Sequence, residues 1–199
     1  MTVISKEQYL ASLRKMKPNI YKFDELIKDV TTHPATRGVV KTHANAFEMA
    51  ENPEIRELSV ATSHFNGEEV MRWTNPMWSK EELVMNMKFK RQMFLEAGNC
   101  QAGECVGWQA LNIMWSVTAD TDAKHGTSYQ QRLKAYILKA QKNGWVIAGA
   151  LTDAKGDRSF GPDKQPENQD AYLHIVEKRE DGIVVTGCKA QIEIGRAHV

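Results

Sequence analysis

The chain has 199 residues, of which 42% are hydrophobic and 8% aromatic, and 26 Lys and Arg balance 25 Asp and Glu. This composition is typical of a folded chain and argues against disorder. There is no excess of basic residues to indicate a nucleic-acid partner, no apolar stretch of the roughly 20 residues that a membrane span needs, and no signal-peptide pattern. We therefore expect a cytoplasmic protein with no nucleic-acid or membrane partner.

Helical periodicity runs through the first three quarters of the sequence, with a start or stop signal at most boundaries. The signals are Ser5 with Gln8, Asn52-Pro53, Ser79 with Glu82, a start near Val106, Ser128 with Gln131, and Asn143-Gly144. The side chains that these helices should bury are Tyr9, Leu10, Leu13 and Met16; Val39, Val40, His43, Phe47 and Ala50; Leu83, Met87, Lys90 and Phe94; Ala110, Ile113, Met114 and Val117; and Leu133, Tyr136, Ile137 and Ala140, with Trp108 and Trp115 as further core.

After Gly144 the spacing of the apolar residues changes from the helical period to the alternation typical of strands. WVIAGAL, from Trp145, predicts a short buried strand, and YLHIVEKREDGIVVTG predicts a hairpin around Asp181-Gly182. Helices followed by strands indicate an α+β fold, with an N-terminal helical domain over 1–145 and a β-domain from 146 to 192. This strand part is too short to close a barrel or sandwich. We therefore expect a truncated β-domain, and a non-native tail over 193–199, EIGRAHV.

Three cysteines, Cys100, Cys105 and Cys188, have no disulfide-framework spacing and are expected to be free thiols or ligands. Cys188 lies in a predicted strand and is expected to belong to the core. No two histidines stand at ligand spacing, so we assign none of them a metal.

The segment GALTDAKGDRSFGP, from Gly149 to Pro162, concentrates paired charges between glycines. Glycine allows backbone N–H groups to approach a ligand closely, and Lys and Arg neutralise phosphate oxygens. Threonine and serine add small hydroxyl donors. The aspartates could orient the lysine and arginine side chains or accept hydrogen bonds from ribose hydroxyls. This set suits a dinucleotide with a pyrophosphate, although no Rossmann fingerprint is present. An exposed loop with local salt bridges is the open alternative.

Two contiguous runs, GALTDAKGDRS and VEKREDGIVVTGCKA, resemble the 4-hydroxyphenylacetate 3-hydroxylase superfamily, as do EQYLASLRKMKPNIY, THPATRG, CVGWQALN and KHGTSYQQRLKAY. The resemblance covers residues 5–192 and is strongest to the 4-hydroxybutyryl-CoA dehydratase branch. It implies an acyl-CoA dehydrogenase-like fold whose C-terminal helical bundle is absent here. It also implies that FAD is bound by Leu151, Thr152, Asp153, Ala154, Lys155, Gly156, Asp157, Arg158 and Ser159, with Gln191 at a further contact that is usually histidine.

The dehydratase branch implies that Cys100 and Cys105 are two ligands of a [4Fe–4S] cluster. The family spacing is Cys-x3-Cys and the spacing here is Cys-x4-Cys, so both thiolates reach one cluster only if the helix breaks or forms a π-bulge at Gly98-Asn99 or Gly103. The branch further implies an acyl-CoA substrate and a homotetramer, with no activity in this piece alone. The general base is not identified.

The alternative is a two-component monooxygenase that uses FAD and oxygen on a phenol. That branch carries an Arg-Ser-Pro-Asp type segment where this chain has NCQAGEC, and a substrate-binding histidine where this chain has Gly149. The resemblance therefore favours the dehydratase.

Overall fold

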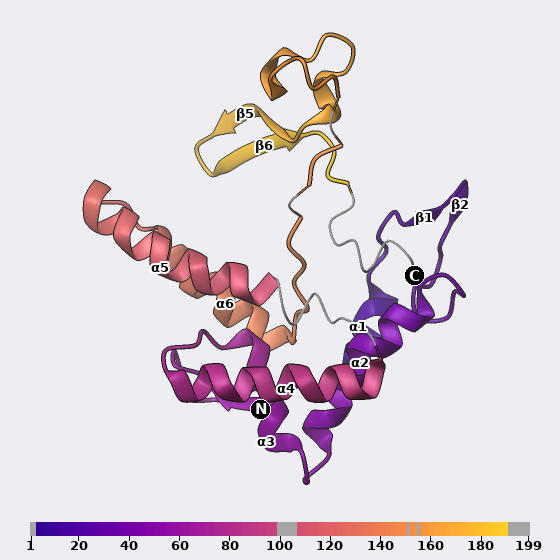
Figure 1. Cartoon of the computed structure of the whole chain (residues 1–199), viewed down its shortest axis with the longest axis vertical. Coiled ribbons are helices and arrows are strands. Elements are labelled where there is room, and N and C mark those ends of the chain that lie inside the picture. Colours follow the sequence, from indigo (N-terminus) through magenta and orange to yellow (C-terminus); the bar gives the residue numbers. More distant parts are fainter. Residues whose placement is uncertain (1–2, 99–106, 151, 155, 191–199) are drawn as a thin grey trace. The chain divides into compact units, whose positions relative to one another are not determined.

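The computed structural model describes residues 3–98, 107–150, 152–154 and 156–190. The chain forms two compact units, which divide between Ala148 and Gly149. We call them unit 1 and unit 2 and describe each by itself; Figure 1 labels the six helices and the strands β1, β2, β5 and β6.

Unit 1 is mainly helical and also contains two small antiparallel hairpins. Its elements are α1 (Lys6–Lys15), β1 (Tyr21–Lys22), β2 (Glu25–Leu26), α2 (Arg37–Glu51), α3 (Arg56–Ser59), β3 (Val60–Thr62), β4 (Glu69–Met71), the 3-10 turn η1 (Arg72–Thr74), α4 (Lys80–Ala97), α5 (Trp108–His125) and α6 (Tyr129–Asn143). β1 pairs with β2 and β3 with β4. The prediction of an all-helical region was wrong at these hairpins, because strands of two or three residues are too short to show alternation.

The helix boundaries follow their capping chemistry. The capping boxes at Ser5 and Ser79 are present, and Gly144, with φ of 59°, ends α6. These three predictions are confirmed. The predicted cap at Ser128 was wrong, since its side chain makes no capping bond. Instead, the carboxylate of Asp122 accepts hydrogen bonds from the backbone N–H groups of Tyr129 and Gln130, both at 2.8 Å.

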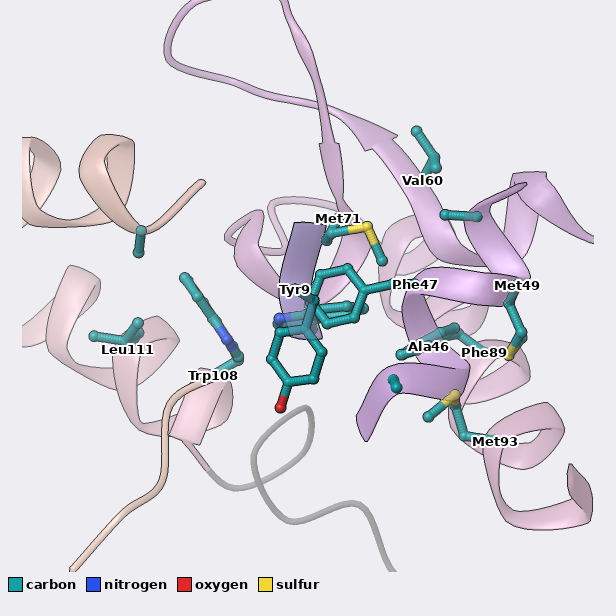
Figure 2. Close-up of a cluster of buried hydrophobic side chains, with 14 of the residues drawn as sticks. Tyr9, Ala46, Phe47, Met49, Val60, Met71, Phe89, Met93, Trp108 and Leu111 are labelled. Atoms are coloured by element: carbon teal, nitrogen blue, oxygen red, sulfur yellow. The ribbon is translucent and has the colours of Figure 1, made fainter. Parts of the chain in front are cut away.

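One apolar core holds unit 1 together. Phe47 on α2 stacks on Tyr9 of α1 at a centroid distance of 4.5 Å and meets Trp73 edge-on at 5.3 Å. Figure 2 shows this cluster, to which α4 contributes Phe89 and Met93. A buried Gln141 on α6 accepts a hydrogen bond from Ser63 and donates one to the carbonyl of Thr74, which ties α6 to the β3–β4 region.

The periodicity selected several exposed residues on two helices, although Lys90 and Trp108 of the expected set are buried. On α4 the buried residues are Asn86, Phe89, Lys90 and Met93. On α5 only Trp108 and Leu111 are buried. The expected core residues that are exposed instead are Met16, Leu83, Met87, Phe94, Ile113, Met114, Val117 and Tyr136. A helical spacing identifies an apolar stripe, but these helices carry apolar residues on more than one side, and only tertiary packing decides which side is covered.

The predicted strand from Trp145 is not formed in the described residues 145–150. Trp145, Val146 and Ile147 pack partly buried against the core of unit 1 instead. Their backbone passes so close to the start of α5 that a Cβ at Gly107 would overlap the carbonyl oxygen of Ile147. Apolar composition predicted burial correctly here. A strand also needs a hydrogen-bonded partner, and none pairs with this segment among the described residues.

Unit 2 is a long loop followed by a hairpin. Its elements are η3 (Pro162–Lys164), η4 (Gln169–Ala171), β5 (His174–Arg179) and β6 (Gly182–Thr186). The predicted hairpin is confirmed: Arg179 pairs with Gly182, which leaves Glu180-Asp181 as the turn. Cys188, expected in the core, follows the end of β6 and is exposed. Across the described segments of both units, we find no helix that combines the length and apolarity needed to cross a bilayer.

Candidate functional site

The loop after Gly149 is anchored to the chain segment that leaves β6. Asp153 forms an isolated antiparallel bridge with Lys189, and their side chains form an ion pair at 2.6 Å. One residue away on each side, the N–H of Ala190 donates to the carbonyl of Thr152 at 2.8 Å. The Asp153 carboxylate is therefore engaged within the protein. Its observed contact holds the loop to the hairpin.

A glycine at the end of the hairpin makes this return possible. Gly187 has φ of +124°, and a Cβ there would overlap the carbonyl oxygen of Tyr172 and lie 2.6 Å from the Cα of Leu173. Only glycine combines that backbone conformation with so close an approach. Gly187 thereby brings the segment with Lys189 back past the start of β5.

The second aspartate of the loop is also satisfied locally. The N–H of Ser159 donates to Oδ1 of Asp157 at 2.8 Å, and the N–H of Phe160 donates to the Asp157 carbonyl at 3.2 Å. Hydrogen bonds from the backbone and the side chain of Ser159 lower the pKa of Asp157. The carboxylate thus forms a tight turn that presents Arg158 at its tip.

A buried glutamine lies inside this loop. Nε2 of Gln165 reaches the carbonyl oxygens of Asp157, Phe160 and Gly161 at 3.0, 3.3 and 3.2 Å. A Cβ at Gly156 would overlap Oε1 of Gln165 and lie 2.9 Å from its Cδ. The glycine leaves room for the amide of Gln165 in the place that it occupies here.

Arg158 is the exposed cation of the loop, and no hydrogen bond or ion pair joins its side chain to another residue in the described ranges. The exposed Ser159 and the half-buried Thr152 lie on the same loop. An exposed guanidinium on a hydrogen-bonded turn suits an anionic ligand such as a phosphate.

Five of the predicted site residues lie outside the described residues: Leu151, Lys155, Gln191, Cys100 and Cys105. α4 ends at Ala97, and Gly98 caps it in the left-handed conformation, with φ of 60°. α4 therefore ends before Cys100. Gly98 is one of the two places where the Cys-x4-Cys spacing would require an interruption of the helix. Among the residues described, no three His, Cys, Asp or Glu side chains gather in a geometry that could hold a metal ion.

Sequence reasoning missed Lys189 and Gln165. Lys189 lies in the recognised run VEKREDGIVVTGCKA, so the signal was present, but its partner Asp153 is 36 positions earlier. Gln165 lies in a polar stretch of the kind that is normally solvent-exposed, and nothing in its neighbours predicts that it is buried.

The chain is thus a helical unit followed by a loop-and-hairpin unit with a glycine-rich turn that carries an exposed arginine. It belongs to the 4-hydroxyphenylacetate 3-hydroxylase N-terminal family, whose model matches residues 5–195.

Two of the proteins that this chain matches are dehydratases. The 4-hydroxybutyryl-CoA dehydratase/vinylacetyl-CoA-Δ-isomerase of Clostridium aminobutyricum is 37% identical over 188 residues, covering 94% of this chain and 38% of the relative. A structure of an oxygen-tolerant archaeal 4-hydroxybutyryl-CoA dehydratase from N. maritimus matches with a TM-score of 0.85 at 36% identity, over 94% of this chain and 37% of that one.

A more distant match shows the fold alone. The oxygenase component of 4-hydroxyphenylacetate 3-monooxygenase, complexed with FAD and 4-hydroxyphenylacetate, has a TM-score of 0.70 at 21% identity, over 94% of this chain and 38% of that one. The chain therefore spans less than two fifths of the length of each of these relatives.

Proposed function

We propose that this chain is the N-terminal, FAD-binding part of a flavin-dependent enzyme that dehydrates a hydroxyacyl-CoA. The observation that carries the proposal is the difference in similarity between two solved structures: 36% identity to a 4-hydroxybutyryl-CoA dehydratase against 21% to an aromatic monooxygenase component, each over 94% of this chain. The complete enzyme would have an acyl-CoA dehydrogenase-like fold, with unit 1 in its helical domain and unit 2 in its β-domain, and would form a homotetramer. The 199 residues alone would be inactive.

The described part of unit 2 fits FAD through its donor set. Arg158 would pair with phosphate oxygens, with Thr152 as a hydroxyl donor. The hydroxyl of Ser159 would support the turn, because its one hydrogen already bonds to Asp157. The observed contacts of Asp153 and Asp157 give both carboxylates a supporting role, because each is already bonded within the loop. Bound FAD would supply the one-electron chemistry that an unactivated C–H bond requires, and this chain would supply position and charge.

The test of the flavin loop is Arg158→Ala in the complete enzyme. Loss of a charged hydrogen bond should weaken FAD binding by about 1.5–3 kcal/mol, measured by fluorescence titration. The matched control is Arg179→Ala, because Arg179 is also exposed in unit 2 and pairs with Glu177 at 2.7 Å on the same strand. Equal FAD affinity in the two variants would refute the assignment.

The dehydratase proposal includes a [4Fe–4S] cluster with Cys100 and Cys105 among its ligands. Enzyme purified without oxygen should contain iron in addition to flavin, and Cys105→Ala should lower iron content and dehydration together while most FAD stays bound. Cys188→Ala is the control thiol, because Cys188 is exposed and lies outside the cluster segment.

The second candidate function is a flavin monooxygenase acting on a phenol, supported by the fold shared with the FAD-bound oxygenase component. The same preparation distinguishes the two. The monooxygenase would contain no stoichiometric iron and would oxidise a phenol when given reduced flavin and oxygen. That result would overturn the dehydratase proposal.

A further inference from the structure

Unit 2 has an unusual interior. Within its described residues only Gln165 and Ala171 are buried, and Gln165 is 4% exposed. The residues flanking Gln165 from Phe160 to Asp170 are all exposed. A glutamine is mostly found at the surface, and its burial is costly unless its amide is hydrogen-bonded.

The amide is hydrogen-bonded, and all three bonds go to one loop. The carbonyls of Asp157, Phe160 and Gly161 lie 3.0–3.3 Å from Nε2. They flank Arg158 and Ser159 on both sides. One side chain therefore fixes the backbone on either side of the exposed cation.

The oxygen of the same amide limits the space available at Gly156, which precedes the turn. Oε1 of Gln165 occupies the space that a Cβ of Gly156 would need, and the Cβ of Ala171 lies 3.6 Å from that position. Both buried side chains of the described part of unit 2 thus face Gly156. The loop is closely fitted around Gln165 from Gly156 to Gly161.

We propose that Gln165 is the positioning residue of this loop: it holds the turn in the shape that presents Arg158 to the phosphates of the flavin. This inference rests on the proposed function for its ligand, but the ordering of the loop by Gln165 can be measured without any ligand.

The first experiment compares Gln165→Met with Gln169→Met in the complete enzyme. Methionine keeps the length of the side chain and removes both amide donors, and Gln169 is an exposed glutamine of the same unit. In Gln165→Met the amides of residues 156–161 should exchange hydrogen at least tenfold faster without FAD, and the dissociation constant of FAD should rise at least tenfold. The melting temperature of the helical unit should stay unchanged. Gln169→Met should resemble the wild type in all three.

The outcomes separate the two claims. Unchanged exchange and unchanged FAD affinity in Gln165→Met overturn the role of Gln165. Faster exchange in an enzyme that never binds FAD overturns the proposed cofactor and supports the role of Gln165 in ordering the loop.

The second experiment covers the case in which Gln165→Met fails to fold. Gly156→Ala should weaken FAD binding at least tenfold, because its Cβ overlaps Oε1 of Gln165. In a Gln165→Ala background that overlap is absent, so the same change should weaken binding less than threefold. Equal losses in the two backgrounds would show that Gln165 does not shape the loop.

Discussion

The two units are stabilised by different kinds of interior. Unit 1 buries a continuous set of aromatic and aliphatic side chains from five helices, α1, α2, α4, α5 and α6 (Figure 2). The described part of unit 2 buries one glutamine and one alanine and depends on hydrogen bonds, an ion pair and a hairpin. Apolar burial is nondirectional and tolerates local change, whereas a polar interior fixes a backbone in one shape. Unit 1 is therefore stabilised mainly by apolar burial, whereas polar contacts hold the loop of unit 2 in one shape, as the ligand surface that we propose would require.

The largest effect should come from the centre of the apolar interior. Phe47 is fully buried against Tyr9 and Trp73. Phe47→Ala should therefore reduce the free energy of unfolding by about 3–5 kcal/mol, measured by urea denaturation. Phe23→Ala is the control, because Phe23 is 91% exposed. It should change the free energy by less than about 0.5 kcal/mol. Similar losses in the two variants would contradict the assigned core.

One physical reason explains why the sequence predicted Phe47 correctly as core but also placed exposed residues of α4 and α5 in the core. α2 has one apolar stripe, so its periodicity indicates a single side of the helix as the buried one. α4 also has apolar residues on its exposed side, Leu83, Met87 and Phe94, and the sequence carries no information about which side another segment covers. In unit 2, the Asp-Gly pair predicts the hairpin locally. The contacts of Gln165 and Lys189 depend on how a long loop folds back.

A smaller effect should come from Gly107, where unit 1 is packed most closely. Gly107→Ala places a Cβ against the carbonyl oxygen of Ile147 and should cost about 1–3 kcal/mol, because neither backbone can move freely. Gly38→Ala is the same change on α2, where no atom lies within 4 Å of the new Cβ. It should stabilise the protein by up to about 1 kcal/mol. If thermal denaturation showed that both variants shift the melting temperature in the same direction, the close approach at Gly107 would be contradicted.

A smaller effect again is expected at the start of α6. Desolvation raises the pKa of Asp122, but hydrogen bonds from Thr127, Gln130 and Tyr129 outweigh it, and the pKa is lowered overall. Asp122→Ala should therefore lower the melting temperature, because two helix N–H groups lose their acceptor. Ser128→Ala should leave it unchanged, since the Ser128 side chain makes no capping bond. A larger loss of melting temperature in Ser128→Ala than in Asp122→Ala would instead show that Ser128 caps α6, as the sequence predicts.

The smallest effect should come from the turn in unit 2 and should depend on pH. The pKa of Asp157 is lowered by hydrogen bonds from the backbone and side chain of Ser159. A carboxyl group whose pKa is lower in the folded state stabilises that state above its unfolded pKa and loses this contribution as the pH falls through the folded value. The turn should therefore loosen only below about pH 4.

Ser159→Ala tests this turn, because it removes the side-chain donor and keeps the backbone N–H. The pKa of Asp157, followed by NMR titration of its carboxyl carbon, should rise part of the way to its ordinary value. Asp157→Asn is the control that removes the titration altogether. A pKa in Ser159→Ala equal to that of the wild type would mean that the serine hydroxyl does not hold this turn.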